Sequence, residues 1–347
     1  MENNLNQVKG IILKEPGKLA DITLPFNGLL KDDEALVKVH RVGICGTDMH
    51  AYKGRQPFFT YPRILGHELG VEVIEVGETV GNVKVGDKCS VEPYFYNEQD
   101  QAPRRGKTNC AEQLSVLGVH EDGGMREYFK LPAKYLHASS KLSYDQLAIV
   151  ETLGIGCHAV NRAQLTKDDF VLVIGVGPIG LGAAQFAKIS GAEVAVMDLS
   201  ANRLAFCQKE LGIDATINLK EEEPLEKLKE IFSEDLPNVI FDATGNVNSM
   251  KATLDYAAHG SRIVFIGLFQ GEFSFFDPLF HKKEITLMSS RNALASDFTQ
   301  IIGLMEIGTI DIKPWINFRM KSTEMVEQFE DLFEPGSNVV KAMVEFS

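Results

Sequence analysis

The chain has 347 residues, 44% hydrophobic and 24% charged, values typical of a folded globular protein with room for two cores. Its formal net charge of −13 argues against nucleic-acid binding, because phosphate contacts need clustered lysine and arginine. Its N-terminus is polar, its five cysteines are widely spaced, and no apolar run is as long as a membrane span. We therefore expect a cytoplasmic protein without a membrane segment or a disulfide framework.

The first part of the chain, residues 1–155, consists of short β-like runs interrupted by Gly, Pro and Asp. Examples are Ala35–Val39, Gly70–Val76 and Lys88–Val91. This pattern predicts a compact, mostly β domain with long loops.

The pattern changes at about residue 156, where apolar strands begin to alternate with helices. The expected strands are Phe170–Ile174, Glu193–Met197, Val239–Phe241 and Arg262–Ile266, and the expected helices Gly180–Ser190 and Asn202–Leu211. Such alternation predicts an α/β domain with a doubly wound parallel sheet, here residues 156–294.

Another helix is expected after Arg291, with Ser296 as its N-cap. Its buried face would carry Phe298, Ile301, Ile302 and Met305. We expect residues 295–347 to fold back onto the first domain, so that the α/β domain is an insertion.

A glycine-rich turn follows the first strand of the α/β domain, with the sequence Gly175-Val-Gly177-Pro178-Ile179-Gly180. Its glycines allow a tight turn, close approach to a pyrophosphate and close helix packing, and the helix N-terminus attracts phosphates. A lone motif of this kind is weak evidence, but here the strand, turn and helix context is complete. The sequence therefore predicts a Rossmann dinucleotide site.

Asp198 ends the next strand, at the position of the acidic residue that accepts hydrogen bonds from the adenosine ribose. A carboxylate there disfavours a 2′-phosphate, which predicts NAD rather than NADP. Arg203, on the following helix, could stack on adenine or be a solvated charge.

Candidate metal ligands lie in three separate segments, at Cys45, at His67 followed by Glu68, and at Glu151. A catalytic zinc takes three such ligands and keeps one position open. Taken singly, Cys45 could be a small buried hydrophobe, His67 a core imidazole and Glu151 a helix charge. Spacing alone does not bring them together.

Four motifs resemble the medium-chain zinc-dependent alcohol and polyol dehydrogenases: GICGTDMH (43–50), YPRILGHE (61–68), EDGGMREY (121–128) and GVGPIGLGAAQ (175–185). They occur in the family's order along essentially the whole chain. Within that family, segments 56–68, 117–125 and 265–293 most resemble bacterial sugar-acid dehydrogenases of the L-galactonate or L-gulonate 5-dehydrogenase type.

The resemblance implies a GroES-like catalytic domain beside the Rossmann domain. It also implies that Cys45, His67 and Glu151 bind one catalytic zinc, while Glu68 approaches the metal or orients its water.

The same resemblance assigns a proton path to two residues near the first ligand. The proton would pass from the substrate oxygen through Thr47 and the cofactor ribose to the imidazole of His50, and Asp48 would orient a ligand from behind.

Many relatives hold a second, structural zinc with four cysteines between Pro93 and Ala111. The corresponding positions here are Asn97, Asp100, Pro103 and Ala111, and the remaining Cys110 matches a neighbouring cysteine that is not a ligand. We therefore expect one zinc per chain. A second departure is Thr152, where close relatives usually have proline.

These features predict zinc-dependent, NAD-linked oxidation of a secondary hydroxyl on a sugar acid. A substrate carboxylate could pair with Lys282, Lys283 or Arg291, although a lysine pair is more commonly solvated and Arg291 could instead contact the cofactor. The alternatives are a polyol, threonine or simple-alcohol dehydrogenase, and more remotely a non-catalytic NAD(H)-binding protein.

Segment 271–288 contains an apolar run at Phe273, Phe275 and Phe276, followed by Ile285 and Leu287. In this family such strands extend the sheet across a two-fold axis. We therefore expect a homodimer or homotetramer.

Overall fold

The computed structural model describes residues 6–57, 59–333 and 338–346. The chain divides into two compact units, each described by itself below. Unit 1 comprises Met1–Thr152 and Leu294–Ser347, and unit 2 comprises Leu153–Ala293. Helix α2 (Tyr144–Ala163) begins in unit 1 and continues into unit 2. Within the described ranges, none of the helices combines the length and apolar character that crossing a bilayer requires.

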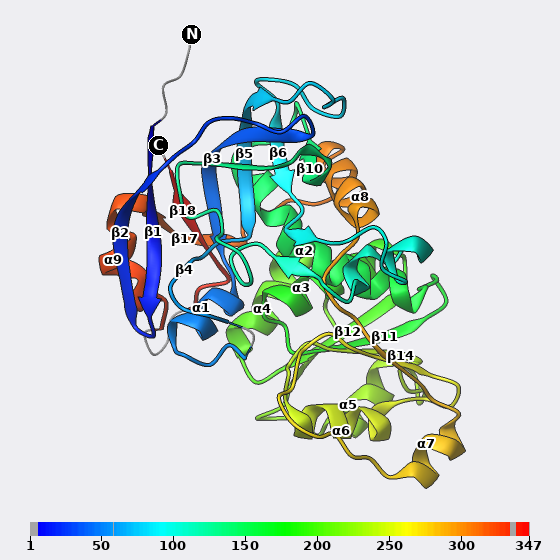
Figure 1. Ribbon diagram of the computed structural model, residues 1–347. Coiled ribbons are helices and arrows are strands. Elements are labelled where there is room, and N and C mark those ends of the chain that lie inside the picture. The colour runs from blue at the N-terminus through cyan, green and yellow to red at the C-terminus, as the bar shows by residue number, and fades with distance from the viewer. Residues whose placement is uncertain (1–5, 58, 334–337, 347) are drawn as a thin grey trace. The chain divides into compact units, whose positions relative to one another are not determined.

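The main sheet of unit 1 has the strand order β10-β6-β5-β3-β18-β17, and β9 also pairs with β3. Its strands are β3 (Glu34–Ile44), β5 (Glu68–Val76), β6 (Lys88–Val91), β9 (Tyr128–Pro132), β10 (Leu136–Ala138), β17 (Ile316–Lys321) and β18 (Lys341–Glu345). Figure 1 shows β3, β5 and β6 side by side. The C-terminal strand β18 pairs antiparallel with β3, so both ends of unit 1 contribute to one sheet.

Alternating side chains on β3 and β5 explain why these segments form half-buried strands. Val37, Val39, Val71 and Val73 are fully buried, whereas the intervening Glu72 is partly exposed. This period of two places the valines in one core and the polar side chains on the other face.

Smaller elements complete unit 1. They are the sheet β2-β1-β4 (Lys18–Pro25, Gln7–Glu15, Arg63–Ile64), the pair β7 (Tyr94–Phe95) and β8 (Ser115–Val116), and helices α1 (Gly46–Tyr52), α8 (Ala295–Glu306) and α9 (Met325–Gln328).

The helix expected after Arg291 is α8, and its predicted apolar face is buried. The predicted N-cap is wrong, because the helix starts at Ala295 and Leu294 occupies the cap position. The Asp297 carboxylate accepts a hydrogen bond from the Leu294 amide at 2.8 Å. A carboxylate reaching back from the first turn stabilises this end, so a serine cap is not needed.

The sheet of unit 2 is parallel, with the order β13-β12-β11-β14-β15-β16. Its strands are β11 (Phe170–Ile174), β12 (Glu193–Asp198), β13 (Thr216–Asn218), β14 (Val239–Asp242), β15 (Arg262–Phe265) and β16 (Thr286–Ser289). The helices are α3 (Pro178–Ile189), α4 (Ala201–Leu211), α5 (Pro224–Ile231), α6 (Val247–Tyr256) and α7 (Asp277–Lys283).

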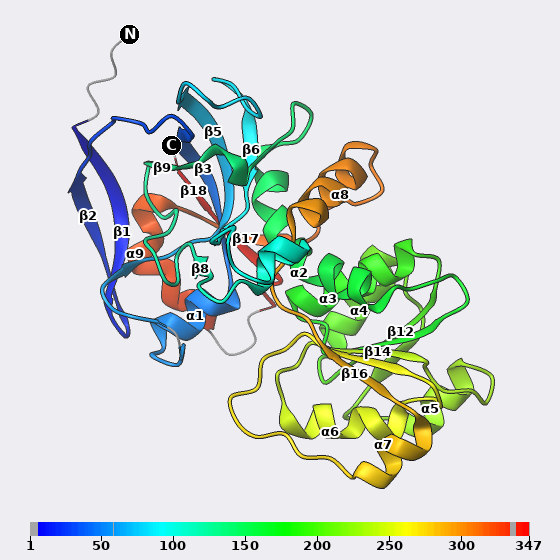
Figure 2. The same cartoon turned by 45° about the vertical axis from the view of Figure 1, so that its right-hand side comes forward.

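Figures 1 and 2 place α3 and α4 on one face of this sheet and α5 and α6 on the other. Strand β11 lies between β12 and β14. The strands that follow β11 are therefore added first on one side of it (β12 and β13) and then on the other (β14 to β16). In doubly wound folds, ligands bind at this kind of switch point. The predicted strands and helices of the α/β part are confirmed to within a few residues.

The apolar run at Phe273, Phe275 and Phe276 does not form the predicted strand. Phe273 instead packs against Phe265, and Phe275 against Phe280, while Phe276 is 69% exposed. Asp277 and the following proline start α7 directly after the run, which excludes a continuing strand.

Candidate active site

The first candidate ligand lies where a strand gives way to a helix. Strand β3 ends at Ile44 and α1 begins at Gly46, so Cys45 occupies the N-cap position between them. Its amide donates a hydrogen bond to Asp48 Oδ2 at 2.9 Å, which fixes the backbone that carries the thiol.

Strand pairing brings the second segment to the first. In the antiparallel pair β3–β5, Gly43 lies opposite Glu68, so His67 and Glu68 enter the sheet beside Cys45. A Cβ atom on Gly43 would lie 2.0 Å from Glu68 Oε2. Any side chain at this position would displace the carboxylate, and the glycine therefore makes room for Glu68.

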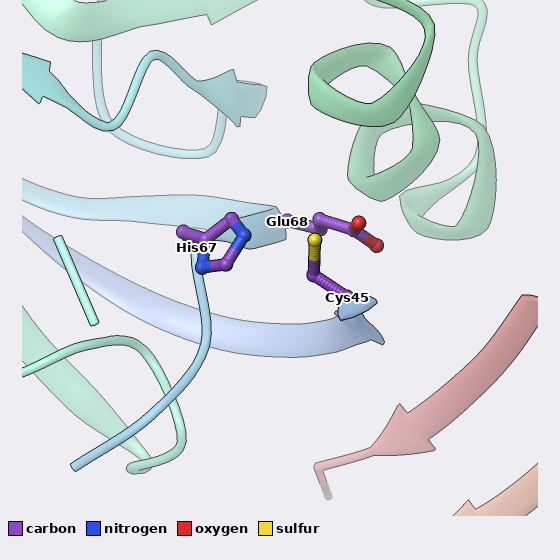
Figure 3. Close-up of side chains that lie close together, drawn as sticks. All are labelled: Cys45, His67 and Glu68. Carbon is purple, nitrogen blue, oxygen red and sulfur yellow. The ribbon is translucent and has the colours of Figure 1, made fainter. Parts of the chain in front are cut away.

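Cys45, His67 and Glu68 form a compact group of possible metal ligands (Figure 3). One ligand atom from each residue lies within 4.8 Å of the others. His67 and Glu68 are buried and Cys45 is partly buried. A thiolate, an imidazole and a carboxylate match the ligand types that zinc takes in proteins.

Glu151 lies on α2, is 4% exposed, and is not one of this group of three. Its Oε1 accepts a hydrogen bond from the Tyr94 hydroxyl. Burial raises the pKa of Glu151, while the charge of His67 opposes that rise and the charge of Glu68 adds to it.

Lys341 is a functional candidate that the sequence analysis missed. Its Nζ donates to Glu68 Oε1 at 2.6 Å, to Oε2 at 2.8 Å and to the Ile44 carbonyl at 3.3 Å. The lysine is only 3% exposed. A lysine directly before the apolar run Ala342–Val344 is a signal that could have revealed it, because a charge carried into a core requires a partner.

Two buried polar atoms behind the group have no hydrogen-bond partner among the described residues. They are His67 Nδ1 and Asp48 Oδ1, which lie 3.9 Å apart. Burial lowers the pKa of His67, but the negative charges of Cys45 and Asp48 outweigh burial and raise it well above its ordinary value. Burial raises the pKa of Asp48.

The donor set therefore fits a divalent cation. Three buried carboxylates and a thiol gather here, and the one lysine among them is already paired with Glu68. An uncompensated buried charge is costly, so a bound cation would stabilise the set.

Two residues of α1 stand on the same face of the helix, three positions apart. Thr47 is partly buried, and His50 is exposed to solvent. The imidazole of His50, which can exchange protons with water, therefore lies about one helical turn from the hydroxyl of Thr47.

The glycine-rich turn of unit 2 joins β11 to α3. Gly175 has φ +81°, which favours glycine, and a Cβ on Gly180 would lie 1.8 Å from the Gly175 carbonyl. At Gly177 a Cβ would meet nothing closer than Arg203 Nη1 at 3.7 Å. The outer two glycines are thus needed by the turn itself, whereas Gly177 leaves the backbone open to a phosphate.

Asp198 at the end of β12 is tied to the turn. Its Oδ2 accepts from the Val176 amide and its Oδ1 from the Ser200 amide, both at 2.8 Å. Arg203 Nη1 lies 3.9 Å from Asp198 Oδ2, so this arginine is an ion-pair partner of the carboxylate.

One of the three candidates for a contact to a substrate carboxylate is already bonded within the protein. Lys283 is buried in unit 2, where its Nζ donates to the carbonyls of Leu254, Asp255 and Ala257 at the end of α6. A lysine occupied in this way stabilises the helix terminus. Lys282 and Arg291 are exposed in this unit.

The segment between Pro93 and Ala111 is connected by polar contacts. Asp100 Oδ2 accepts from the amides of Glu112 and Gln113, at 3.1 and 3.4 Å, which ties the middle of the segment to the residues that directly follow it. Asn97 Oδ1 accepts from the Gln99 amide at 3.0 Å.

Comparison with protein families agrees with this geometry. The alcohol dehydrogenase GroES-like domain model matches residues 31–141, and the zinc-binding dehydrogenase model matches residues 178–306. Fold and site together define a medium-chain oxidoreductase.

L-galactonate-5-dehydrogenase of Escherichia coli K12 is 40% identical over 338 residues, which cover 97% of this chain and 98% of the relative. Sorbitol dehydrogenase of Bacillus subtilis is 29% identical, with 97% of each chain covered. A crystal structure described as a short chain alcohol dehydrogenase from E. coli CFT073, complexed with the cofactor NADH, has a TM-score of 0.91 and 29% identity and covers 98% of this chain and 100% of that one.

The chain belongs to the zinc-type alcohol dehydrogenases of the medium-chain family, and it is an oxidoreductase that acts on a CH–OH group. The expected family, fold class and enzyme class are confirmed, and zinc and NAD are the cofactors of this family.

Proposed function

We propose that this dehydrogenase oxidises a secondary hydroxyl of a sugar acid, of the L-galactonate or L-gulonate type, to the ketone in a reversible step of carbohydrate metabolism. The observation that carries the proposal is the 40% identity to L-galactonate-5-dehydrogenase over nearly the whole chain. The metal-ligand group in unit 1 and the glycine-rich turn in unit 2 support the reaction type.

We assign the zinc to Cys45, His67 and Glu151, with Glu68 as the second carboxylate at the site. When bound, zinc acts as a Lewis acid that makes a substrate hydroxyl more acidic. Asp48 faces His67 Nδ1 at 3.9 Å, so its role is to orient the imidazole from behind. Lys341 holds Glu68.

We assign proton transfer to the two residues on α1. The Thr47 hydroxyl accepts the proton from the substrate oxygen while giving its own proton to the cofactor ribose, and His50 passes a proton on to solvent. The exposure of His50 and its place one turn from Thr47 support this assignment.

The dinucleotide is assigned to the turn Gly175–Gly180, with its pyrophosphate at the start of α3. Gly177, Pro178 and Ile179 form the first turn there, and Asp198 binds the ribose. The NADH complex of the related structure supports NAD, as does the acidic Asp198. We place Arg203 beside the adenosine and Arg291 at the cofactor or the substrate.

A carboxylate substrate needs a local cation, because the chain as a whole is strongly negative. Lys283 and Lys341 are already bonded within the protein. Arg291 is exposed, and its planar guanidinium can hold a carboxylate through two hydrogen bonds, so it is our candidate for the substrate contact.

The second candidate substrate is a neutral polyol, which is favoured by the likeness to sorbitol dehydrogenase along 97% of both chains. A polyol would need no cation. Activity on L-threonine or simple alcohols is a further alternative within the family.

The test is NADH formation by the purified, zinc-loaded enzyme with L-galactonate, L-gulonate, sorbitol, D-arabitol and L-threonine. We expect the two sugar acids to have the highest kcat/KM. Turnover of neutral polyols alone would overturn the sugar-acid proposal while leaving the dehydrogenase. No turnover of any alcohol would favour a non-catalytic NAD(H)-binding protein.

Two variants locate the carboxylate contact. Arg291→Ala should raise KM for sugar acids but not for sorbitol, and Lys229→Ala, an exposed lysine on α5 of the same unit, is the control. A rise in KM for NAD alone would place Arg291 at the cofactor instead.

We also propose a homodimer or homotetramer that assembles through unit 2. Strand β16 is the last strand of its sheet, and Leu268 and Phe276 are 70% and 69% exposed nearby in the sequence. Sedimentation equilibrium of the wild type and of Phe276→Glu tests this. All five cysteines are free thiols in the structure, which supports our proposal of a cytoplasmic location.

A further inference from the structure

The two carboxylates near the metal-ligand group have different buried partners. Glu68 is bonded by a cation, since Lys341 donates to both of its oxygens. Glu151 is bonded by a neutral donor, since the Tyr94 hydroxyl contacts Oε1. Tyr94 has no place in the roles assigned above.

Tyr94 is held firmly enough to act as a support. It is 2% exposed and starts the short strand β7, where it pairs with Val116 of β8. Its ring meets Phe298 of α8 edge to face, with the centroids 6.4 Å apart. Packing on both the strand and the helix limits the directions in which the hydroxyl can point.

The chemistry of the two donors differs in its effect on the carboxylate. Lys341 compensates the charge of Glu68 and occupies both oxygens. A phenol supplies one hydrogen bond and no charge, so Glu151 keeps its second oxygen and its anionic character. A carboxylate such as Glu151, with one oxygen bonded by a phenol, can therefore bind a metal through its other oxygen.

We propose that Tyr94 is a positioning residue for the metal site. Its hydroxyl fixes Glu151 Oε1 and leaves Oε2 as the oxygen that binds the metal. This inference rests on the proposed role of Glu151 as a ligand. It also connects the segment that follows Tyr94, where many relatives have a second zinc, to the metal site through one hydrogen bond.

The test compares Tyr94→Phe with Tyr135→Phe. Tyr135 is also buried in unit 1, and its hydroxyl accepts a hydrogen bond from the Tyr96 amide at 3.2 Å, so its loss reproduces the removal of a buried hydroxyl away from Glu151. Zinc affinity is measured by competition with a chelator, and the visible spectrum of the cobalt(II)-substituted protein reports ligand geometry.

We expect Tyr94→Phe to weaken zinc binding about 10- to 100-fold, as is typical for a partner that orients a ligand, and to shift the cobalt spectrum. Tyr135→Phe should change neither. Unchanged affinity and spectrum in Tyr94→Phe would overturn the proposal, and so would an equal change in the control.

A double-mutant cycle separates positioning from general destabilisation. In a Glu151→Ala background, Tyr94→Phe should cause no further loss of zinc affinity, because the side chain that it orients is gone. A full additional loss there would overturn the proposal. Absence of zinc binding by the wild type would contradict the proposed function itself. Zinc binding by the wild type that Tyr94→Phe leaves unchanged would contradict only the role of Tyr94.

Discussion

The metal-ligand group of unit 1 and the dinucleotide turn of unit 2 are built in opposite ways. The turn is contiguous, since Gly175–Gly180 joins one strand to one helix and only Asp198 comes from outside it. The proposed metal site draws on residues 45, 67, 68, 151 and 341, which come from four segments spread along most of the chain. A local site depends on backbone geometry, whereas an assembled site depends on the sheet that brings its parts together.

This difference implies that the two sites can be damaged separately. A change in the metal site should remove zinc and leave dinucleotide binding intact, and a change at Asp198 should do the reverse. Four substitutions test the comparison.

Cys45→Ser should have the largest effect. A serine hydroxyl is a far poorer zinc ligand than a thiolate, so we expect bound zinc to be lost and kcat/KM to fall by more than about 100-fold, beyond the usual cost of losing a group behind a ligand. Metal analysis and NADH titration measure the two sites. Loss of NADH binding together with zinc would contradict their independence.

Lys341→Met removes the charge that compensates Glu68 and keeps much of the side-chain volume. Leaving Glu68 buried without its partner should lower the free energy of unfolding of the metal-free protein by about 3–5 kcal/mol. The loss should be smaller with zinc bound, because a cation again compensates the carboxylates. Urea unfolding with and without a chelator measures both values, and Lys321→Met, an exposed lysine on β17, serves as the control.

Asp198→Ala should act on unit 2 alone. It removes the carboxylate that we assign to the ribose, so KM for NAD should rise about 10- to 100-fold, the equivalent of one hydrogen bond to a charged group. The preference for NAD over NADP should narrow, and zinc content should stay the same. If wild-type enzyme already prefers NADP, the assignment of Asp198 is wrong.

Asp100→Ala should have the smallest effect. It removes the acceptor for the amides of Glu112 and Gln113, and we expect the free energy of unfolding to fall by about 1 kcal/mol. Zinc content should remain near one per chain, as in the wild type, since no ligand is lost. Metal analysis showing a second zinc in the wild type would contradict our reading of this segment.

The four strands and two helices that we predicted in the α/β part were predictable because each buried run is contiguous and is bounded by glycine or a polar turn, whereas β13, α5, α6 and α7 were not predicted. Phe170–Ile174 was predicted to the residue, since a strand buried on both faces is apolar throughout. The strand predicted at Phe273–Phe276 was wrong, because aromatic side chains that pack against one another can give an alternating apolar pattern without the backbone hydrogen bonds of a strand. The N-cap predicted at Ser296 was wrong, because the carboxylate of Asp297 accepts a hydrogen bond from the amide of Leu294, which is the actual cap residue.

The candidate ligands came from a family resemblance, because no rule of local spacing brings residues 45, 67 and 151 together. The structure adds the β3–β5 register that places Gly43 against Glu68. Lys341 and Tyr94 were missed, since their partners lie 273 and 57 residues away in the sequence. Whether Lys283 was solvated or bound an anion depended on the fold, because its three carbonyl partners lie at the end of α6, 26 to 29 residues earlier in the sequence.

The position of β18 has a consequence for biosynthesis. Every proposed metal ligand has been translated once the ribosome passes residue 151, but β18 and Lys341 follow unit 2 in the sequence. The nascent chain therefore exposes the edge of β3 at residues 41–44, where β18 later pairs, and leaves Glu68 without its ammonium partner, while unit 2 is already able to fold. Unit 1 therefore completes its sheet last, when β17 and β18 have been translated.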